Sequence, residues 1–191
     1  MSGLSETVSD SMNDDPLDGI EKQVRQPRNY ESPPLHLWHP PLSGEIPIRI
    51  TAEGHWLHDG GRITRESLVS LFASILRREE DGEYYLVTPA EKWRIEVELH
   101  PLIVTDVEGR EGDGSELLEV TLNTGKKVLL GQDHPLFLEP RVGGIAAVRL
   151  DHGLTALFSR AAWYRLVERA REVGGVPGVS SGGVVFPLLA V

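Results

Sequence analysis

The chain has 191 residues, a formal net charge of -10 and no cysteine. A surface this acidic repels nucleic-acid polymers, although it leaves room for a local basic pocket that binds one small anion. The lack of cysteine excludes disulfides, thiolate catalysis and cysteine-based zinc sites.

Targeting and membrane signals are absent from the sequence pattern. The N-terminus has no basic region followed by an apolar run, so a signal peptide is not expected. No stretch approaches the roughly 20 apolar residues of a membrane helix, and the apolar segment 184–189 is short and interrupted by Pro187. The sequence therefore predicts a cytoplasmic protein that does not enter a membrane.

Residues 1–32 are rich in Ser, Asp, Glu and Asn. They cannot bury enough apolar surface to offset their conformational entropy, so we predict a disordered acidic leader. From 33 to 47, prolines alternate with leucines and Trp38. A free linker has little use for these apolar side chains, so this segment is predicted to lie as an extended strap on the first subdomain, residues 33–100.

The first subdomain begins with two short strands at 48–50 and 56–57, separated by a turn. Apolar residues then recur at i, i+3, i+4 and i+7. This spacing predicts a helix with Thr64 as N-cap, Arg65 as its first residue and an end at Arg77-Arg78.

A strand at 84–87 precedes Thr88-Pro89-Ala90-Glu91, which has the spacing of a capping box. Only one helical turn can follow, because apolar and charged residues alternate over 93–99. This alternation predicts a half-buried strand.

The second subdomain, 101–191, is dominated by strand patterns, with an acidic loop at 109–114. A helix is expected from about Arg160 to Val173, with Ser159 as N-cap and Trp163, Leu166, Val167 and Ala170 facing inward. Strands are expected at 102–107, 118–122, 127–130, 145–150, 154–158 and the C-terminus.

Two segments repeat one order of features: an apolar-Arg-apolar strand, a second strand, a hydroxyl residue, an arginine and an apolar helix face. They run from Ile48 to Leu71 and from Val148 to Leu166. His-Pro-Leu also occurs twice, at 100–102 and 134–136. The shared order indicates an α+β protein of two related subdomains from internal duplication, each a small, mostly antiparallel sheet with one main helix.

Motifs from Trp38 to the C-terminus resemble the pattern of an uncharacterised bacterial family, the domain-of-unknown-function family DUF1285. The residues that carry the resemblance are Trp38 to Gly44, Ile48-Arg49-Ile50, Gly54-His55-Trp56, Ile63-Thr64-Arg65, Leu71-Phe72, Tyr85 to Lys92, His134-Pro135-Leu136, Ser159-Arg160 and Ser181-Gly182-Gly183. No single motif is specific, but their number and order are.

The resemblance implies two duplicated α+β subdomains, the second superficially like a pleckstrin-homology fold. It also implies a cleft between them that binds a nucleotide-like ligand in a signalling role. The family offers no established activity or catalytic residues, so none is carried over. This chain has Leu99-His100 where the family pattern has an acidic residue before proline, so no role of that acid is transferred.

Arginines are the first candidates for function. A cation in the first turn of a helix faces the positive end of the macrodipole, yet Arg65 and Arg160 are both predicted there. Arg49 and Arg149 lie within strands. Guanidinium suits bidentate binding of phosphate, so we hypothesise that Arg65 and Arg160 flank the cleft and hold an anionic ligand. At any single site a structural role is favoured, in which the arginine forms an ion pair with an internal acid such as Glu53 or Glu91.

Trp56 and Lys92 complete the candidate ligand-binding set. Trp56 offers a ring for stacking on a base, although aromatic residues at strand spacing belong more often to a core. Lys92 follows the capping box, within the DUF1285 motif.

Other chemistry is disfavoured by spacing. No metal site is predicted, because His55 and His58, three residues apart on a strand, point to opposite faces. The segment 178–182 matches the hydrolase elbow G-x-S-x-G formally, but no Asp or His follows it, so a Gly/Ser turn is predicted. The glycines of the loop 109–114 have the wrong order for a dinucleotide-binding loop.

These patterns predict a non-enzymatic ligand-binding or signalling module that holds a small anionic, nucleotide-like ligand between its subdomains, with no cofactor and no catalytic residue assigned. Two alternatives stay open. One is an enzyme acting on a nucleotide or other phosphorylated metabolite, with Lys92 or one of His55, His58 and His134 as acid or base. The other is a protein-interaction domain that uses the strap or exposed β edges, with a partner that the sequence does not identify.

Overall fold

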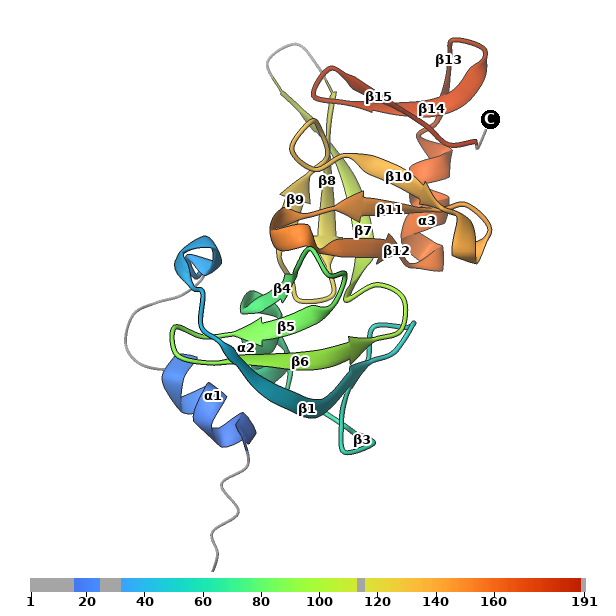
Figure 1. Cartoon of the computed structure of the whole chain (residues 1–191). Helices are drawn as coiled ribbons and strands as arrows, with labels where there is room; N and C mark the ends of the chain where they lie inside the picture. The colour runs from blue at the N-terminus through green and yellow to red at the C-terminus, as the bar shows by residue number, and fades with distance from the viewer. Residues whose placement is uncertain (1–15, 25–31, 113–115, 190–191) are drawn as a thin grey trace, which may run out of the picture.

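The computed structural model describes residues 16–24, 32–112 and 116–189. Over these residues the chain forms two α+β lobes, one above the other in Figure 1. Each lobe contains a six-stranded, mostly antiparallel sheet with one parallel strand pair, and one main helix. A separate three-stranded sheet ends the chain.

The N-terminal lobe is built on a sheet of order β3-β2-β1-β6-β5-β4. Its elements are the 3-10 turn η1 (Leu35–Leu37), β1 (Leu42–Ile50), β2 (Trp56–His58), β3 (Gly61–Arg62), α2 (Glu66–Ser74), β4 (Leu76–Arg78), β5 (Tyr84–Val87) and β6 (Lys92–Val97). Alternate residues of β1, including Ile46, Ile48 and Ile50, are buried, as the apolar alternation requires. The strap residues Leu35 and Trp38 are also buried in this lobe.

Helix α2 is shorter than predicted. It begins at Glu66, with Arg65 rather than Thr64 at the N-cap, and the backbone amides of Leu68 and Val69 donate to the Arg65 carbonyl. It ends at Ser74 rather than at Arg77-Arg78, because residues 76–78 pair with β5 as the edge strand β4. Residues 88–91 form a hydrogen-bonded turn in which the Glu91 amide donates to the Thr88 hydroxyl, with no helical turn after it.

The leader departs from the prediction of disorder where the structure describes it. Residues Pro16–Val24 form helix α1, and Ile20 and Val24 are buried in the core of the N-terminal lobe. The helix is stable there because its spaced apolar residues find a tertiary partner, which composition alone does not reveal. The rest of the predicted leader, 1–15 and 25–31, lies outside the described residues.

The C-terminal lobe has the sheet order β10-β11-β12-β7-β8-β9. Its elements are β7 (Leu102–Glu111), β8 (Glu116–Leu122), β9 (Lys127–Leu129), β10 (Leu136–Glu139), η2 (Pro140–Val142), β11 (Ile145–Arg149), η3 (Asp151–Gly153), β12 (Thr155–Phe158) and α3 (Arg160–Glu168). The predicted acidic loop is strand up to Glu111, and 113–115 lie outside the described residues.

Helix α3 has the predicted N-cap, since the Ser159 hydroxyl accepts from the Ala162 amide. It ends at Glu168, not Val173, because residues 171–173 form strand β13 (Arg171–Val173) beside β14 (Val176–Ser181) and β15 (Val184–Pro187). Val167 is exposed rather than inward, and Ala162 and Leu166 face the core. The G-x-S-x-G match therefore lies in β14 and its following turn, and the Ser181 hydroxyl donates to the Leu130 carbonyl.

A hairpin followed by a helix occurs in both lobes, as β1-β2 before α2 and as β11-β12 before α3. Arg49 pairs with Leu57 in the first hairpin, and Arg149 pairs with Thr155 in the second. The hairpins join their sheets differently: β1, the first strand, is parallel to β6, whereas β12, the second strand, is parallel to β7.

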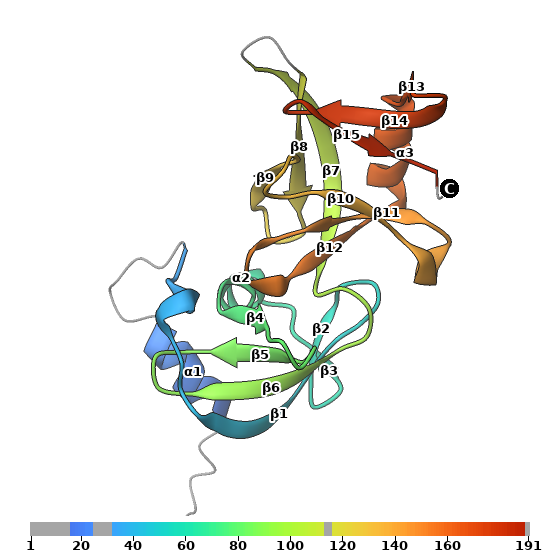
Figure 2. The same cartoon turned by 45° about the horizontal axis from the view of Figure 1, so that its top comes forward.

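The lobes meet where α2 and β4 of the N-terminal lobe approach the start of β7 and the turns of the C-terminal sheet. Figure 2 shows η3, the turn between β11 and β12, beside α2 and β4. Along the part of the chain that the structure describes, none of the helices has the length and apolar character needed to cross a membrane.

Candidate functional site

The four candidate arginines lie apart, each with a local partner. Arg49 pairs with Glu98 (Nε–Oε1, 3.4 Å) and Arg65 with Glu21 of α1 (2.8 Å), so the partners are not the predicted Glu53 and Glu91. The guanidinium of Arg149 lies 4.8 Å from the centre of the Phe137 ring, and that of Arg160 lies 5.7 Å from the centre of the Tyr164 ring. None of the four lines either of the two hollows between the lobes that are described below.

Lys92 and Trp56 also have local roles. The Lys92 ammonium pairs with Glu79 at 2.8 Å and lies over the Tyr85 ring. Trp56 is only 2% exposed and packs against Phe72 of α2, with ring centres 6.2 Å apart. Its indole N–H finds no hydrogen-bond partner within the described residues. Of the six candidates, Trp56 alone lines a hollow between the lobes.

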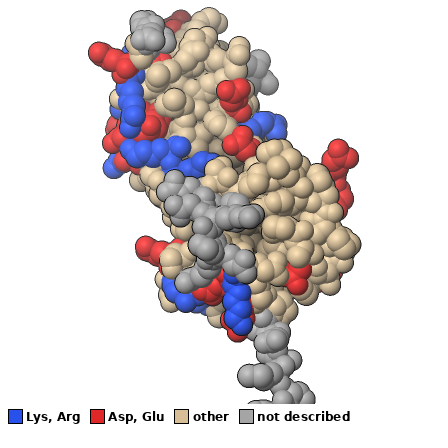
Figure 3. Space-filling model, turned by 90° about the vertical axis from the view of Figure 1, so that its left-hand side faces the viewer, with Lys and Arg blue, Asp and Glu red and all other residues tan. Residues whose placement is uncertain are grey.

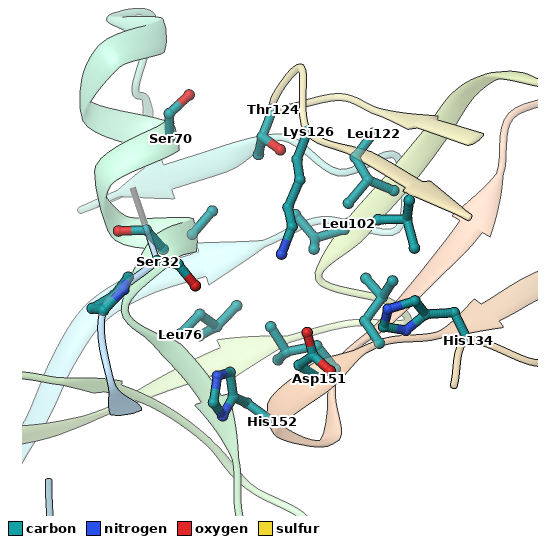
Figure 4. A pocket seen from close by; sticks show the side chains of 16 residues that line it. Ser32, Ser70, Leu76, Leu102, Leu122, Thr124, Lys126, His134, Asp151 and His152 are labelled. Atoms are coloured by element: carbon teal, nitrogen blue, oxygen red, sulfur yellow. The ribbon is translucent and has the colours of Figure 1, made fainter. Parts of the chain in front are cut away.

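The smaller hollow, which we call the Lys126 pocket, has a volume of about 110 Å³. Its walls come from the strap, α2, β4, the first residues of β7, the β8–β9 turn and η3, so both lobes contribute. Figure 4 shows the Lys126 side chain extending into the space between α2 and η3. The polar lining residues are Ser32, Ser70, Ser74, Thr124, Lys126, His134, Asp151 and His152.

Lys126 differs from its neighbour in its surroundings. Lys127 pairs with Glu119 (3.0 Å) and Glu108 (3.5 Å) at the start of β9. Lys126 lines the pocket and, over the described part of the chain, forms no ion pair. Its ammonium is therefore a positive charge available to a bound anion. Figure 3 shows one side of the molecule, where lysine and arginine side chains form a band on the C-terminal lobe that extends to the boundary between the lobes.

Two histidines line the same pocket. The Nδ1 atom of His134 is buried and has no hydrogen-bond partner among the described residues. His152 has a left-handed backbone (φ 57°), an uncommon conformation that is often found at functional sites. Burial lowers the pKa of His152, against the opposing effect of Asp151.

The larger hollow, which we call the Trp56 groove, has a volume of about 620 Å³. It lies between the β2–α2 segment of one lobe and β7 with the β8–β9 turn of the other. Ser70 and Thr124 line both hollows. The two hollows are therefore adjacent, with α2 and the β8–β9 turn contributing to both.

A buried polar network anchors the interlobe linker, residues 98–101 between β6 and β7. The ring of His100, 2% exposed, contacts the Thr155 hydroxyl through Nδ1 (2.7 Å) and the Glu139 carboxylate through Nε2 (2.9 Å). Arg141 donates to both oxygens of Glu139 and holds the pKa of that carboxyl down, at about 2. Burial lowers the pKa of His100. The arrangement resembles a catalytic triad in its contacts, but His100 is closed to solvent, so its role is to fix the linker.

Sequence reasoning singled out His134, and it missed Lys126, Asp151 and His152. The repeated His-Pro-Leu tripeptide was the available signal, since one copy supplies the buried His100 and the other supplies His134 of the pocket. Within residues 16–24, 32–112 and 116–189, no three His, Asp or Glu side chains gather closely enough to hold a metal ion.

Comparisons with known proteins agree over most of the chain. Residues 33–99 match the family described as "Domain of unknown function (DUF1285), N-terminal domain", and residues 101–188 match "Protein of unknown function (DUF1285), C-terminal domain". None of the curated proteins matches the chain.

Two crystal structures are similar to the chain. A DUF1285 family protein from Silicibacter pomeroyi is 36% identical, with a TM-score of 0.81, over 91% of this chain and 96% of that one. A DUF1285 family protein from Shewanella baltica is 32% identical, with a TM-score of 0.53, over 64% of this chain and 91% of that one. The family matches and the overall likeness to the first structure show that the chain belongs to the DUF1285 family.

Proposed function

We propose that the chain is a ligand-binding module with a signalling role, which holds a small anionic, nucleotide-like ligand at the junction of its two lobes. The observation that carries the proposal is Lys126: its ammonium extends into a pocket lined by both lobes and forms no ion pair within the described residues. In a chain of net charge -10, a cation left without an acidic partner at a lobe junction favours an anionic ligand.

The proposal keeps the site between the two lobes and replaces the arginines by Lys126 as the group that binds the anion. Arg65 and Arg160, which were expected to flank the cleft, are occupied by Glu21 and Tyr164. The lysine, the His134 and His152 rings and the hydroxyls of the Lys126 pocket provide several donors for phosphate-like oxygens.

The test compares two adjacent lysines. Isothermal titration with inorganic phosphate and a panel of phosphorylated metabolites is done on the natural chain, on Lys126→Met and on Lys127→Met. Removing one charged donor should weaken anion binding about 10-fold or more in Lys126→Met. Lys127→Met removes the same charge outside the pocket and should bind as the natural chain does. Equal affinities in all three proteins would reject the site.

The alternatives give different results in the same experiment. A ligand recovered chemically changed would favour the enzyme, with His134 as the first residue to replace. If no compound binds, the protein-interaction domain becomes the better explanation.

Three finer points stay predictions. Internal duplication is supported by the hairpin followed by a helix in each lobe, and superposition of residues 42–74 on 145–168 tests it. The likeness of the C-terminal lobe to a pleckstrin-homology fold is tested by the same kind of superposition. A cytoplasmic location is tested by cell fractionation.

A further inference from the structure

The two hollows at the lobe junction differ in size. The Lys126 pocket, at about 110 Å³, has room for one compact group. The Trp56 groove, at about 620 Å³, is within the range of small-molecule sites, roughly 300–1,000 Å³. Ser70 and Thr124 line both, so the two hollows are adjacent, and a molecule that occupied both would pass these two residues.

The charge of the lining changes between the two spaces. The pocket contains Lys126 and two imidazoles against one carboxylate, Asp151. The groove contains two carboxylates, Glu53 and Glu66, against one guanidinium, Arg62, and one imidazole, His55. A hydrogen bond from Thr51 lowers the pKa of Glu53, so this carboxyl is ionised at neutral pH. An anionic group suits the pocket and is disfavoured in the groove.

The groove also has an apolar wall with hydrogen-bonding groups around it. Trp56, Ile63 and Ile103 contribute apolar surface from both lobes. Thr64, Thr105 and the carboxylates contribute hydroxyl groups and acceptors. This mixture fits a ring with hydroxyl or amino groups and no negative charge.

We infer that the ligand is bipartite, with its single compact anion in the Lys126 pocket and an uncharged or cationic, hydrogen-bonding body in the Trp56 groove. This inference rests on the proposed function and specifies its ligand class: molecules with one compact anionic head, such as phosphomonoesters of a sugar or of a nucleoside. Molecules with a second anionic group at the far end of the body are excluded by Glu53 and Glu66.

The experiment titrates the full chain with inorganic phosphate, ribose 5-phosphate, adenosine monophosphate, a nucleoside bisphosphate, ribose and adenosine. At least one monoester should bind 10-fold or more tightly than inorganic phosphate and than its unphosphorylated counterpart. The bisphosphate should bind no more tightly than the monoester.

Variants of the groove then test whether the body of the ligand lies there. Thr64→Trp and Thr105→Trp place a large ring in the groove from opposite lobes, and both positions are exposed, so folding should survive. Each should remove the 10-fold advantage of the monoester and leave binding of inorganic phosphate unchanged. Ser67→Trp, on an exposed position of α2 outside both hollows, is the matched control and should change neither affinity.

The outcomes separate the two proposals. If every monoester binds only as tightly as phosphate, or if the advantage survives both groove variants, the bipartite ligand is wrong while the anion pocket stands. If neither phosphate nor any ester binds, the proposed function fails, and this inference fails with it.

Discussion

Two buried titratable side chains, His100 and Glu139, hold the interlobe linker and make the stability of the chain sensitive to acid. Glu139 has a lowered pKa, about 2, so its ionised form stabilises the fold fully above its ordinary range and loses this contribution as the pH falls from about 4.5 towards 2. His100 has a lowered pKa as well, and its neutral form stabilises the fold above its usual pKa of about 6.5. Both effects therefore destabilise the protein as the pH falls.

We predict that the free energy of unfolding, measured by urea denaturation, decreases from pH 7 to pH 5 and again to pH 3. The Glu139 contribution to this decrease is at most about 3 kcal/mol. Glu139→Gln should lower stability at pH 7 and flatten the acidic part of the profile. Glu96→Gln, on an exposed position of β6, is the control and should retain the profile of the natural chain. If the free energy of unfolding of Glu139→Gln still falls steeply at acidic pH, other titratable groups cause the decrease.

His152 carries a second residue-scale prediction, which concerns binding. Its pKa is lowered by burial, and Arg77, His36 and Lys126 lower it further, while Asp151 raises it. Sulfate keeps its charge over the range, so its affinity for the pocket should rise several-fold as the pH falls from 7.5 to 5.5 and the ring gains a proton. His152→Asn keeps a residue that tolerates the left-handed backbone and should bind sulfate with a flatter pH dependence. An unchanged slope in this variant would place the titrating group elsewhere.

At the scale of elements, local signals in the sequence predicted one helix start and missed the other, where Arg65 rather than Thr64 is the N-cap. The β11–β12 hairpin and the Ser159 N-cap of α3 were correct, because turn and capping preferences act within a few residues. The C-terminal ends of both main helices were wrong. Residues 76–78 and 171–173 leave the helical pattern to pair with β5 and β14, and such pairing depends on partners elsewhere in the chain.

In the candidate site, too, residue types could be read from the sequence, whereas their partners could not. Arginine at helix starts was visible in the sequence, but the partners Glu21 and Tyr164 are set by tertiary structure and by helix geometry. Lys126 and Lys127 are equivalent in sequence, and only the placement of the β8–β9 turn makes one of them line the pocket and the other pair with Glu119. Sequence reasoning reached the junction between subdomains as a location and missed the residues that line it.

Helix α1 provides an element-scale prediction. Ile20 is fully buried, and the helix is further held by the Arg65–Glu21 ion pair and a Gln23–Glu91 hydrogen bond of 3.0 Å. Ile20→Ala should cost about 2 kcal/mol and raise amide hydrogen exchange in α1, because the cavity weakens its main contact. Lys22→Ala, exposed on the same helix, should change neither quantity. Equal exchange in both variants would mean that the polar contacts hold the helix.

At the scale of the whole molecule, the shape of both hollows depends on how closely the two lobes approach, since both hollows lie between them. Two glycines mark points of close approach between the lobes. A Cβ atom at Gly54 of the first lobe would lie 2.5 Å from Ile103 Cγ1 of the second, and one at Gly153 would lie 2.9 Å from the Arg78 carbonyl oxygen of β4. Both glycines also have positive φ, which disfavours any side chain. The two contacts set the spacing of the lobes and thereby the shape of the pocket and the groove.

Matched glycines separate backbone strain from the contact between lobes. Gly54 (φ 81°) is compared with Gly60 (φ 78°), and Gly153 (φ 71°) with Gly143 (φ 72°), because neither control has an atom within 4 Å of the added Cβ. Alanine at each control should cost roughly 1–2 kcal/mol for the left-handed backbone. Gly54→Ala and Gly153→Ala should cost more in urea denaturation, since a lobe must also move. They should also weaken binding of the phosphomonoester that the natural chain prefers, whereas Gly60→Ala and Gly143→Ala should bind it normally. If each pair behaves alike in both measurements, the lobes tolerate a wider spacing and the hollows do not depend on close approach.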